Sequence, residues 1–198
     1  MPAPKLQPRS KTADEILDIA EFLIQTRGYS AFSYQDIAAK LGIRKASIHY
    51  HYPTKAELGC AVVERYVSTF EQALAQMSGD STKSSYDIFE FFMQPFFAFA
   101  KTPDRICLCG ALAGEILALP PVLRELVNEF FVRQQAWLTR FLKRGLVDGS
   151  FRFSQPPAKM ARTIFGALHG ALLIKRATGN AAGLRDVVSV INAQLTAA

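Results

Sequence analysis

Side chains that could contact a polyanion gather in one short stretch of the chain. They combine two cations, a hydroxyl, an imidazole and a phenol: Arg44, Lys45, Ser47, His49 and Tyr50. Groups of these kinds form hydrogen bonds with phosphate oxygens and with the edges of nucleic-acid bases. The run 40–55 contains four Lys and Arg residues and no Asp or Glu. Such a run is often only a solvated charged face, so its meaning depends on the elements that carry it.

Two short helices joined by a tight turn would position these side chains. Ser33 can cap the first helix, with Asp36 three residues later as its partner in a capping box. Gly42 ends that helix, because glycine adopts the left-handed conformation at low cost. A narrow apolar stripe on the first helix can pack against the body of the domain: Ile37, Ala38 and Leu41.

The second helix, about residues 45–51, is too short and too polar to be explained by core packing. Ala46 and Ile48 are expected to be buried, which leaves the donors and rings available to a partner. A short helix of this kind, placed after a helix and a tight turn, is typical of a helix-turn-helix. The second helix of such a motif lies in the major groove of DNA.

This part of the chain resembles the N-terminal domain of TetR-type transcriptional regulators. The resemblance runs over residues 11–60 without a gap. Three motifs carry it in the family's order: Gly28-Tyr29, then Ser33-Tyr34-x-Asp36-Ile37-Ala38-x-x-Leu41-Gly42-Ile43, then Ser47-Ile48-His49-Tyr50-His51-Tyr52-Pro53-Thr54-Lys55-x-x-Leu58. His49 stands where most members have Tyr, and Tyr52 replaces the usual Phe. Both residues still offer rings and hydrogen-bonding groups. We therefore expect these two replacements to change which DNA sequence is recognised, and not whether DNA is bound.

The resemblance implies two sets of DNA contacts. Base contacts are expected mainly from Arg44, Lys45, Ser47, His49 and Tyr50. Phosphate contacts are expected from Ser33, Tyr34, His51 and Lys55, with helix N-termini assisting. Lys55 lies in the first turn of a helix, where a cation opposes the helix dipole. Contact with a phosphate would account for that position.

Composition bounds the remaining possibilities. With 198 residues, of which 49% are apolar and 20% charged, the chain is long and apolar enough for one large domain or two unequal ones. No apolar run approaches the ~20 residues that cross a bilayer, and residues 1–5 lack the apolar core of a signal peptide. We therefore expect a cytoplasmic protein without membrane contact. Three cysteines, an odd number, argue against a disulfide framework.

Motifs of common enzyme classes are missing from the sequence. There is no Gly-x-Ser-x-Gly elbow, no phosphate-binding glycine loop and no His-Glu-x-x-His zinc motif. Cys107-x-Cys109 is a weak metal motif, because the chain has no second spaced pair. We therefore predict a protein that is not an enzyme and has no cofactor and no metal.

Helical periodicity continues through the rest of the chain, without a strand of consequence. The predicted fold class is all-α with about nine helices, as in the TetR family. Residues 1–55 are expected to form a flexible N-terminal arm and the helix-turn-helix DNA-binding domain. Residues 56–198 are expected to form a helical ligand-binding and dimerisation domain. Within these domains, Thr12 should begin the first helix, and Pro103-Asp104 should begin the helix after the most aromatic stretch.

Small residues in the penultimate helix indicate a close helix–helix approach. They recur at helical spacing: Gly166, Ala167, Gly170 and Ala171. Glycine inside a helix costs about 1 kcal/mol relative to alanine, which suggests a packing reason. The TetR resemblance implies that the last two helices pair with their copies in a two-fold dimer. Packing within one chain is the alternative.

The aromatic helices could enclose an effector. Rings and polar groups that would line such a pocket are Phe89, Phe92, Phe96, Cys107, Glu115, Trp137, His169 and Arg176. Ring-rich helices are more often plain core, and each polar group could equally be a satisfied core group. The resemblance favours a cavity, because TetR-type regulators usually hold an inducer in this half of the chain. The sequence does not identify the ligand.

Cys107 has a second possible role. A thiol at the start of a helix can have a lowered pKa, and Lys175 could favour its thiolate further. The Cys-Leu pair at this position resembles a subgroup of the TetR family whose members include sensors of electrophiles or oxidants. A small, buried and inert cysteine is the alternative.

The sequence thus predicts a homodimeric TetR-type regulator, most simply a repressor, that binds a palindromic operator in double-stranded DNA. A small-molecule effector in the C-terminal domain would release it. The first alternative is a thiol-based redox or electrophile sensor that acts through Cys107 on the same DNA-binding scaffold. The remote alternative is a helical enzyme or carrier with a vestigial DNA-binding domain. Repression and activation are not distinguished.

Overall fold

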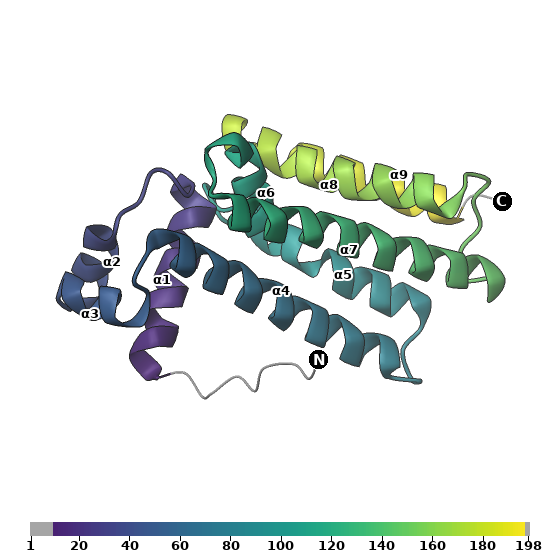
Figure 1. Ribbon diagram of the computed structural model, residues 1–198. Helices are drawn as coiled ribbons and strands as arrows, with labels where there is room; N and C mark the ends of the chain where they lie inside the picture. The colour runs from purple at the N-terminus through teal and green to yellow at the C-terminus, as the bar shows by residue number, and fades with distance from the viewer. Residues whose placement is uncertain (1–9, 197–198) are drawn as a thin grey trace.

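The structure, a computed structural model, describes residues 10–196, and within them it contains nine α-helices, one short 3-10 helix and no strand (Figure 1). The helices are α1 (Lys11–Arg27), α2 (Tyr34–Leu41), α3 (Lys45–His51), α4 (Lys55–Gly79), α5 (Ser85–Ala100), α6 (Leu108–Gly114), η1 (Ile116–Ala118), α7 (Pro121–Val147), α8 (Pro157–Thr178) and α9 (Ala182–Thr196). The all-α prediction is therefore confirmed. Most of the predicted N-terminal arm lies outside the described residues.

Helices α1, α2 and α3 form a compact unit around a shared apolar core. Its members come from all three helices and are fully buried: Ile16, Leu17, Leu23, Ile24, Ile37 and Ile48. Ser33 and Asp36 form the capping box, in which the Asp36 carboxylate accepts from the backbone N–H of Ser33 at 2.8 Å. The Ser33 hydroxyl also donates to that carboxylate at 2.7 Å. Gly42 ends α2 with φ of 67°. These local predictions are confirmed.

The start of α1 differs from the prediction. Ser10, not Thr12, is the cap, because its hydroxyl accepts a hydrogen bond from the backbone N–H of Ala13 at 3.2 Å. The helix therefore begins one residue before Thr12, at Lys11. Ser10 and Thr12 both have a hydroxyl that could cap the helix, and the preference for Ser or Thr at the N-cap does not choose between them.

Helix α4 connects this unit to the rest of the molecule. It packs against α1 at one end and against α5 and α7 along its length. In Figure 1 it runs from the α1–α3 unit along the larger bundle. A change in how α4 sits in the bundle would therefore reach the α1–α3 unit directly.

Aromatic rings fill the core of the larger bundle. Phe89 of α5 stacks on Phe92 and on Phe141 of α7, with ring centroids 6.2 and 6.4 Å apart. Trp137 stacks on Phe92 at 5.3 Å. Phe151, in the connection after α7, lies so close to Gly145 that a Cβ at that glycine would overlap its ring. Interlocked rings of this kind fix how α5 and α7 pack.

The segment between α5 and α6 is a loop, so the prediction that Pro103-Asp104 begins a helix is wrong. Tertiary contacts hold this loop. The backbone N–H of Ile106 donates to the carbonyl oxygen of Gln25 at 3.4 Å, and the Lys175 ammonium donates to the carbonyl oxygen of Pro103 at 2.7 Å. These contacts override the helix-start signal.

None of the helices in residues 10–196 combines the length and the apolar character that crossing a membrane would need.

Candidate nucleic-acid interface and effector site

Helix α3 presents a polar, basic face to solvent. Ile48 is fully buried and anchors the helix to α1 and α2. Arg44 and Lys45 are exposed, and Tyr50 is 84% exposed, although its ring is large and partly apolar. An aromatic side chain held so far out on a short, anchored helix is available to a partner surface. Among the described residues, no salt bridge involves either cation.

The rotation of α3 differs slightly from the sequence prediction. Ala46, expected to be buried, is exposed, and Ser47, expected to meet the partner, is half-buried. In a helix of seven residues, apolar spacing alone does not decide which of two neighbouring small residues faces inward.

His49 is fixed in one orientation. Its Nδ1 lies 3.1 Å from the carbonyl oxygen of Pro53, an acceptor, so Nδ1 carries the proton. Its ring packs against Tyr34 with centroids 4.6 Å apart. Nε2 of the neutral ring is therefore left as an acceptor on an exposed side chain. Such a group could accept a hydrogen bond from the amino group of adenine or cytosine.

Two of the predicted phosphate ligands have other contacts in this structure. Tyr34 is 5% exposed, and its hydroxyl donates to the carbonyl oxygen of Tyr52 at 2.7 Å, so that side chain holds α2 to the end of α3. The Lys55 ammonium donates to the carbonyl oxygen of Phe32 and lies over the rings of Tyr29 and Phe32, 4.7 and 4.4 Å from their centroids. Burial lowers the pKa of Lys55. Ser33 is exposed and His51 half-exposed.

Glu115, predicted to orient a ligand, contacts the α1–α3 unit. Its two carboxylate oxygens accept hydrogen bonds from the backbone N–H groups of Tyr29 and Ser30, both at 2.8 Å. Gly28 has φ of 96°, and a Cβ there would overlap Oε1 of Glu115. Burial opposes ionisation, but the bonds from Ser30 and Tyr29 outweigh it, so the pKa of Glu115 is lowered. The contact therefore persists at neutral pH and weakens as the pH falls through that pKa.

Arg176, also predicted to meet a ligand, caps the same end of α1. Its guanidinium donates to the carbonyl oxygen of Thr26 at 2.7 Å. The C-terminal turn of α1 is thus held from α8 by Arg176 and from the end of α6 by Glu115. Neither long-range pairing leaves a local signal in the sequence.

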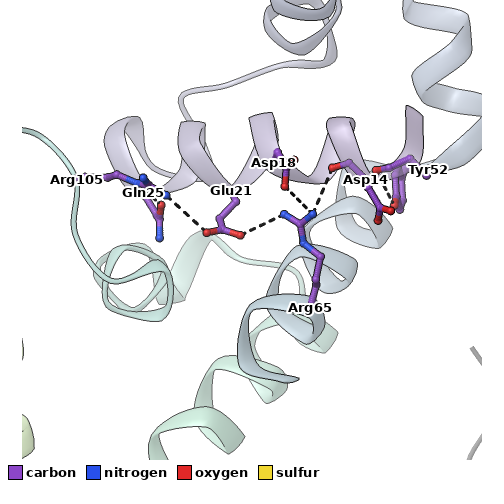
Figure 2. Close-up of polar contacts among 8 residues, drawn as sticks. Asp14, Asp18, Glu21, Gln25, Tyr52, Arg65 and Arg105 are labelled. Atoms are coloured by element: carbon purple, nitrogen blue, oxygen red, sulfur yellow. Dashed lines mark hydrogen bonds and ion pairs between the residues drawn. The ribbon is translucent and has the colours of Figure 1, made fainter. Parts of the chain in front are cut away.

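Charged groups also connect the middle of α1 to α4 and to the α5–α6 loop (Figure 2). Arg65 of α4 forms ion pairs with Asp18 at 2.7 Å and with Glu21 at 3.3 Å. Arg105 in the loop donates from Nε to Oε1 of Gln25 at 2.6 Å, and its NH2 lies 3.8 Å from Glu21. Sequence reasoning missed all of these residues, because the partners are at least 44 positions apart in the chain.

Cys107 is buried and belongs to a cluster with Tyr66 and His169. The Tyr66 hydroxyl donates to Sγ at 3.6 Å. His169 Nδ1 donates to the carbonyl oxygen of Phe165 at 2.9 Å, and its Nε2 is buried with no hydrogen-bond partner among the described residues. Burial would raise the pKa of Cys107, but the nearby imidazole of His169 outweighs that effect and lowers the pKa. Burial raises the pKa of the neighbouring Cys109.

The predicted activator of Cys107, Lys175, serves a different purpose. It is 2% exposed, and its ammonium donates to the carbonyl oxygens of Phe99, Thr102 and Pro103. These carbonyls close the C-terminus of α5 and the following turn. Lys175 therefore stabilises the end of a helix, and His169 takes the place next to the thiol.

The aromatic half of the molecule contains two adjoining spaces. The inner one has a free volume of about 30 Å³, and Phe92, Phe96, Cys107 and His169 are among its lining residues. The outer one is an open cleft of about 700 Å³ between α1, α4 and α5. Phe89 is a core residue and lines neither space, and Trp137 lies at a different surface hollow next to Arg140. Four of the eight predicted ligand residues therefore lie together.

The small residues of α8 leave an open strip on its surface. A Cβ added at Gly166 or Gly170 would meet nothing within 4 Å. Ala171 is buried inside the chain, whereas Ala167 is half-buried. Leu173 and Ile174 continue the strip and are 49% and 63% exposed. These two apolar residues follow Gly166 and Gly170 at helical spacing. The sequence pattern could therefore have added them to the predicted dimer interface, which did not include them.

Comparison with known proteins agrees with this architecture. Residues 16–62 match the family described as bacterial regulatory proteins, tetR family, and residues 90–191 match the tetracyclin repressor-like C-terminal domain. The HTH-type transcriptional repressor DhaR of a Mycobacterium species is 25% identical over 169 residues, which are 83% of this chain and 82% of that protein.

Solved structures show the same relationship. A TetR transcriptional regulator from Legionella pneumophila is 30% identical, with a TM-score of 0.85 over 96% of this chain and 100% of that one. A TetR-family regulator from Agrobacterium tumefaciens is 32% identical, with a TM-score of 0.85 over 93% and 97% of the two chains. The reduced form of NemR from Escherichia coli, 20% identical with a TM-score of 0.79 over 94% of this chain and 98% of that one, shares the fold. The chain belongs to the TetR family of bacterial transcriptional regulators, which bind DNA.

Proposed function

We propose that this protein is a homodimeric repressor that holds a palindromic operator through two copies of α3 and leaves it when a small molecule binds the C-terminal domain. The observation that carries the proposal is the exposed face of α3, with Arg44, Lys45 and Tyr50 around the buried anchor Ile48. Relatives that match over most of this chain, DhaR and KstR2, are named as repressors. Residues 1–55 would form the DNA-binding domain and residues 56–198 the effector and dimer domain.

The contacts of α3 divide by chemistry. Arg44 and Lys45 would donate to base edges or phosphates, Nε2 of His49 would accept from a base, and Tyr50 would contact bases with its ring or hydroxyl. Ser47, being half-buried, would contribute least. Phosphates would be met by Ser33, His51 and Lys55 as residues of the flanking turns. Tyr34 would contribute its backbone N–H, one of the free donors at the start of α2.

The dimer would form through α8 and α9. Gly166 and Gly170 let a second helix approach closely, and Leu173, Ile174 and the 56% exposed Val190 would lose contact with water there. Two reading helices related by a two-fold axis would reach half-sites about 34–36 Å apart. The symmetry of the protein would thus account for a palindromic operator.

Selection of bound fragments from random DNA tests this function. The full-length protein would be incubated with the random pool, and recovered sequences would be measured for affinity at several salt concentrations. We expect an inverted repeat and a linear fall of log affinity with log salt, at a slope of about 0.9 per phosphate neutralised. Recovery of fragments without a shared sequence would contradict the proposal.

Coupling between effector and operator would pass through the end of α1. Glu115, Arg176 and Arg105 join that end to the bundle, while α2 and α3 pack on α1. These contacts would have one arrangement that binds DNA and another that does not. An effector that binds the second arrangement more tightly would shift the population of molecules toward it. The loss of operator affinity cannot exceed this difference in the effector's affinity for the two arrangements.

Replacement Glu115→Gln tests this connection. We expect hydrogen exchange at the amides of Tyr29 and Ser30 to become about ten- to a hundred-fold faster, because a charge-assisted pair of bonds is worth about 1.5–3 kcal/mol. The measurement is amide exchange by NMR or mass spectrometry on the full chain. The control is Glu125→Gln, an exposed residue of α7. Unchanged exchange at both amides would show that Glu115 does not hold this turn.

A second candidate function is a thiol sensor on the same scaffold. The observation that favours it is the buried cluster in which Cys107 accepts a hydrogen bond from Tyr66 and lines the same space as the His169 imidazole. An imidazole near a thiol favours the thiolate, which is the reactive form of cysteine. Modification of Cys107 would enlarge a side chain within an almost filled space. The strain would be transmitted to α6, whose end carries Glu115.

Alkylation with iodoacetamide separates the two candidates. For a sensor, we expect Cys107 to react at pH values below the usual pKa of a thiol, and His169→Asn to slow the reaction at pH 7 by about ten-fold. The two rates should converge at high pH, where both thiols are ionised. Mass spectrometry reads the modified site, with Cys109 as an internal control. A Cys107→Ser protein that responds normally to the effector would end this candidate.

A further inference from the structure

The open cleft between α1, α4 and α5 has the dimensions of a ligand site. Its volume of about 700 Å³ lies within the usual range for small-molecule pockets. α1 contributes Asp18, Glu21 and Gln25, α4 contributes Arg65 and Phe70, and α5 contributes Phe99. The wall from α1 belongs to the DNA-binding unit, so a molecule in this cleft would touch both halves of the protein.

Gln25 carries the strongest sign of a missing partner. The residue is 1% exposed, and its Oε1 accepts from Nε of Arg105 at 2.6 Å. Its amide nitrogen Nε2 is buried and has no hydrogen-bond partner among the described residues. In Figure 2 this nitrogen points away from Arg105. A buried amide N–H without a partner is unfavourable, and a ligand oxygen would satisfy it.

The groups around Gln25 have more donors than acceptors. Arg65 already engages Asp18 and Glu21 at 2.7 and 3.3 Å. Arg105 meets Glu21 at the longer distance of 3.8 Å, and its side chain is 37% exposed. Beyond the Nε–H that donates to Gln25, the terminal N–H groups of Arg105 have only the long contact with Glu21, and the Gln25 amide nitrogen has no partner among the described residues, so these groups can meet an incoming acceptor. A planar guanidinium next to an amide N–H suits a carboxylate, which accepts from both.

The opposite wall of the cleft is apolar and leads inward. The cleft and the inner aromatic space adjoin, because four residues line both: Tyr66, Phe70, Pro95 and Phe99. Gln134 is 1% exposed, and its Oε1 has no partner among the residues that the structure describes. The inner space itself is almost filled, so the apolar part of a ligand would lie mainly along the shared wall.

We propose that this cleft binds a small amphipathic carboxylic acid, whose carboxylate meets Arg105 and Gln25 and whose apolar part covers Phe70, Pro95 and Phe99. This inference rests on the proposed function and names the chemical class of its effector. The carboxylate would compete with Glu21 for Arg105. Binding would thereby change one of the contacts that hold α1 against the bundle.

Calorimetric titration of the full-length protein tests the inference. The probes are phenylpropionate and octanoate, each compared with its uncharged amide, which has nearly the same shape. We expect at least one acid to bind about ten-fold or more tightly than its amide, as a charge-assisted bond to guanidinium implies. Trp137, the one tryptophan of the chain, stacks on Phe92 of the inner space and gives a second, fluorescence readout.

Two variants locate the site. Arg105→Ala and Gln25→Met should each weaken the acid by about ten-fold or more and leave the amide nearly unchanged. Arg124→Ala, which removes an exposed arginine of α7, should bind the acid like the parent protein. Circular dichroism shows whether each variant is folded. If Arg105→Ala does not fold, Gln25→Met alone tests the site.

The outcomes separate this inference from the proposed function. If neither acid binds at millimolar concentration, if acid and amide bind equally, or if both variants bind the acid like the parent, the carboxylate site is refuted. Operator binding by the same samples is measured independently. If no carboxylate site is found but the protein binds its operator, only the effector inference fails and the repressor proposal stands. If the protein does not bind an operator, the repressor proposal fails, and the titration still decides whether the cleft binds a carboxylic acid.

Discussion

The double replacement Arg44→Ala/Lys45→Ala removes sequence-specific DNA binding while leaving the fold intact. Both side chains are exposed on α3, and neither belongs to a salt bridge among the described residues, so little stability is lost. A guanidinium that reads a base is worth about 1–3 kcal/mol of affinity. In a two-fold dimer each replacement occurs twice, so Arg44→Ala alone should weaken operator binding by roughly thirty- to ten-thousand-fold.

The two cations should differ in salt dependence. If Lys45 contacts a phosphate, Lys45→Ala lowers the slope of log affinity against log salt by about 0.9 per copy and weakens all DNA sequences alike. If Arg44 reads a base, its loss relaxes the sequence preference and changes the slope less. Fluorescence anisotropy with the selected operator and a scrambled duplex, at three salt concentrations, measures both quantities.

Lys143→Ala is the matched control for these variants. Lys143 is an exposed cation near the C-terminal end of α7, and that end of the helix lies far from α3 in Figure 1. Its removal changes the net charge by the same amount as Lys45→Ala. Equal losses of affinity in Lys143→Ala and Lys45→Ala would show that net charge, and not the α3 surface, determines DNA binding.

Local rules predicted the DNA-binding unit because its structure is locally determined. The Ser33 cap, the left-handed Gly42 and the buried Ile48 each depend on residues within a few positions of one another. Two predictions in this unit were wrong: the cap of α1, which is Ser10 and not Thr12, and the rotation of α3, where Ala46 is exposed and Ser47 half-buried. Seven residues make fewer than two complete turns beyond the caps, so contact with α1 decides the rotation.

The effector region was harder to predict because its polar residues find partners far away in the chain. Glu115 pairs with backbone groups 85 and 86 positions earlier, and Arg176 pairs with one 150 positions earlier. A sequence indicates that such residues need partners, but not which ones. Gln25 illustrates the converse, because nothing in the pattern of α1 distinguishes it from a surface glutamine, yet it is 1% exposed.

Lys175→Met should be the most damaging single replacement outside the DNA-binding unit. Methionine matches the length and apolar stem of lysine but removes the ammonium that serves the carbonyls of Phe99, Thr102 and Pro103. The Phe99 carbonyl keeps two donors from Thr102, its N–H at 3.2 Å and its hydroxyl at 3.0 Å, whereas the carbonyls of Thr102 and Pro103 lose the donor that Lys175 supplies. Leaving an acceptor unpaired costs about 1–3 kcal/mol, so we expect the free energy of unfolding to fall by roughly 2–4 kcal/mol.

Urea unfolding followed by Trp137 fluorescence and circular dichroism measures this loss. Lys159→Met, an exposed lysine of the same helix, should change the free energy of unfolding by less than about 0.5 kcal/mol. The Lys175→Met protein should also show faster amide exchange at Ile106, because the loop that Lys175 holds donates from that residue to Gln25. If Lys175→Met unfolds at the same urea concentration as the parent, the carbonyls of Thr102 and Pro103 are satisfied by water. The loop would then be held to α1 by Arg105 and Ile106 alone, and the end of α5 would be free to move when the cleft is filled.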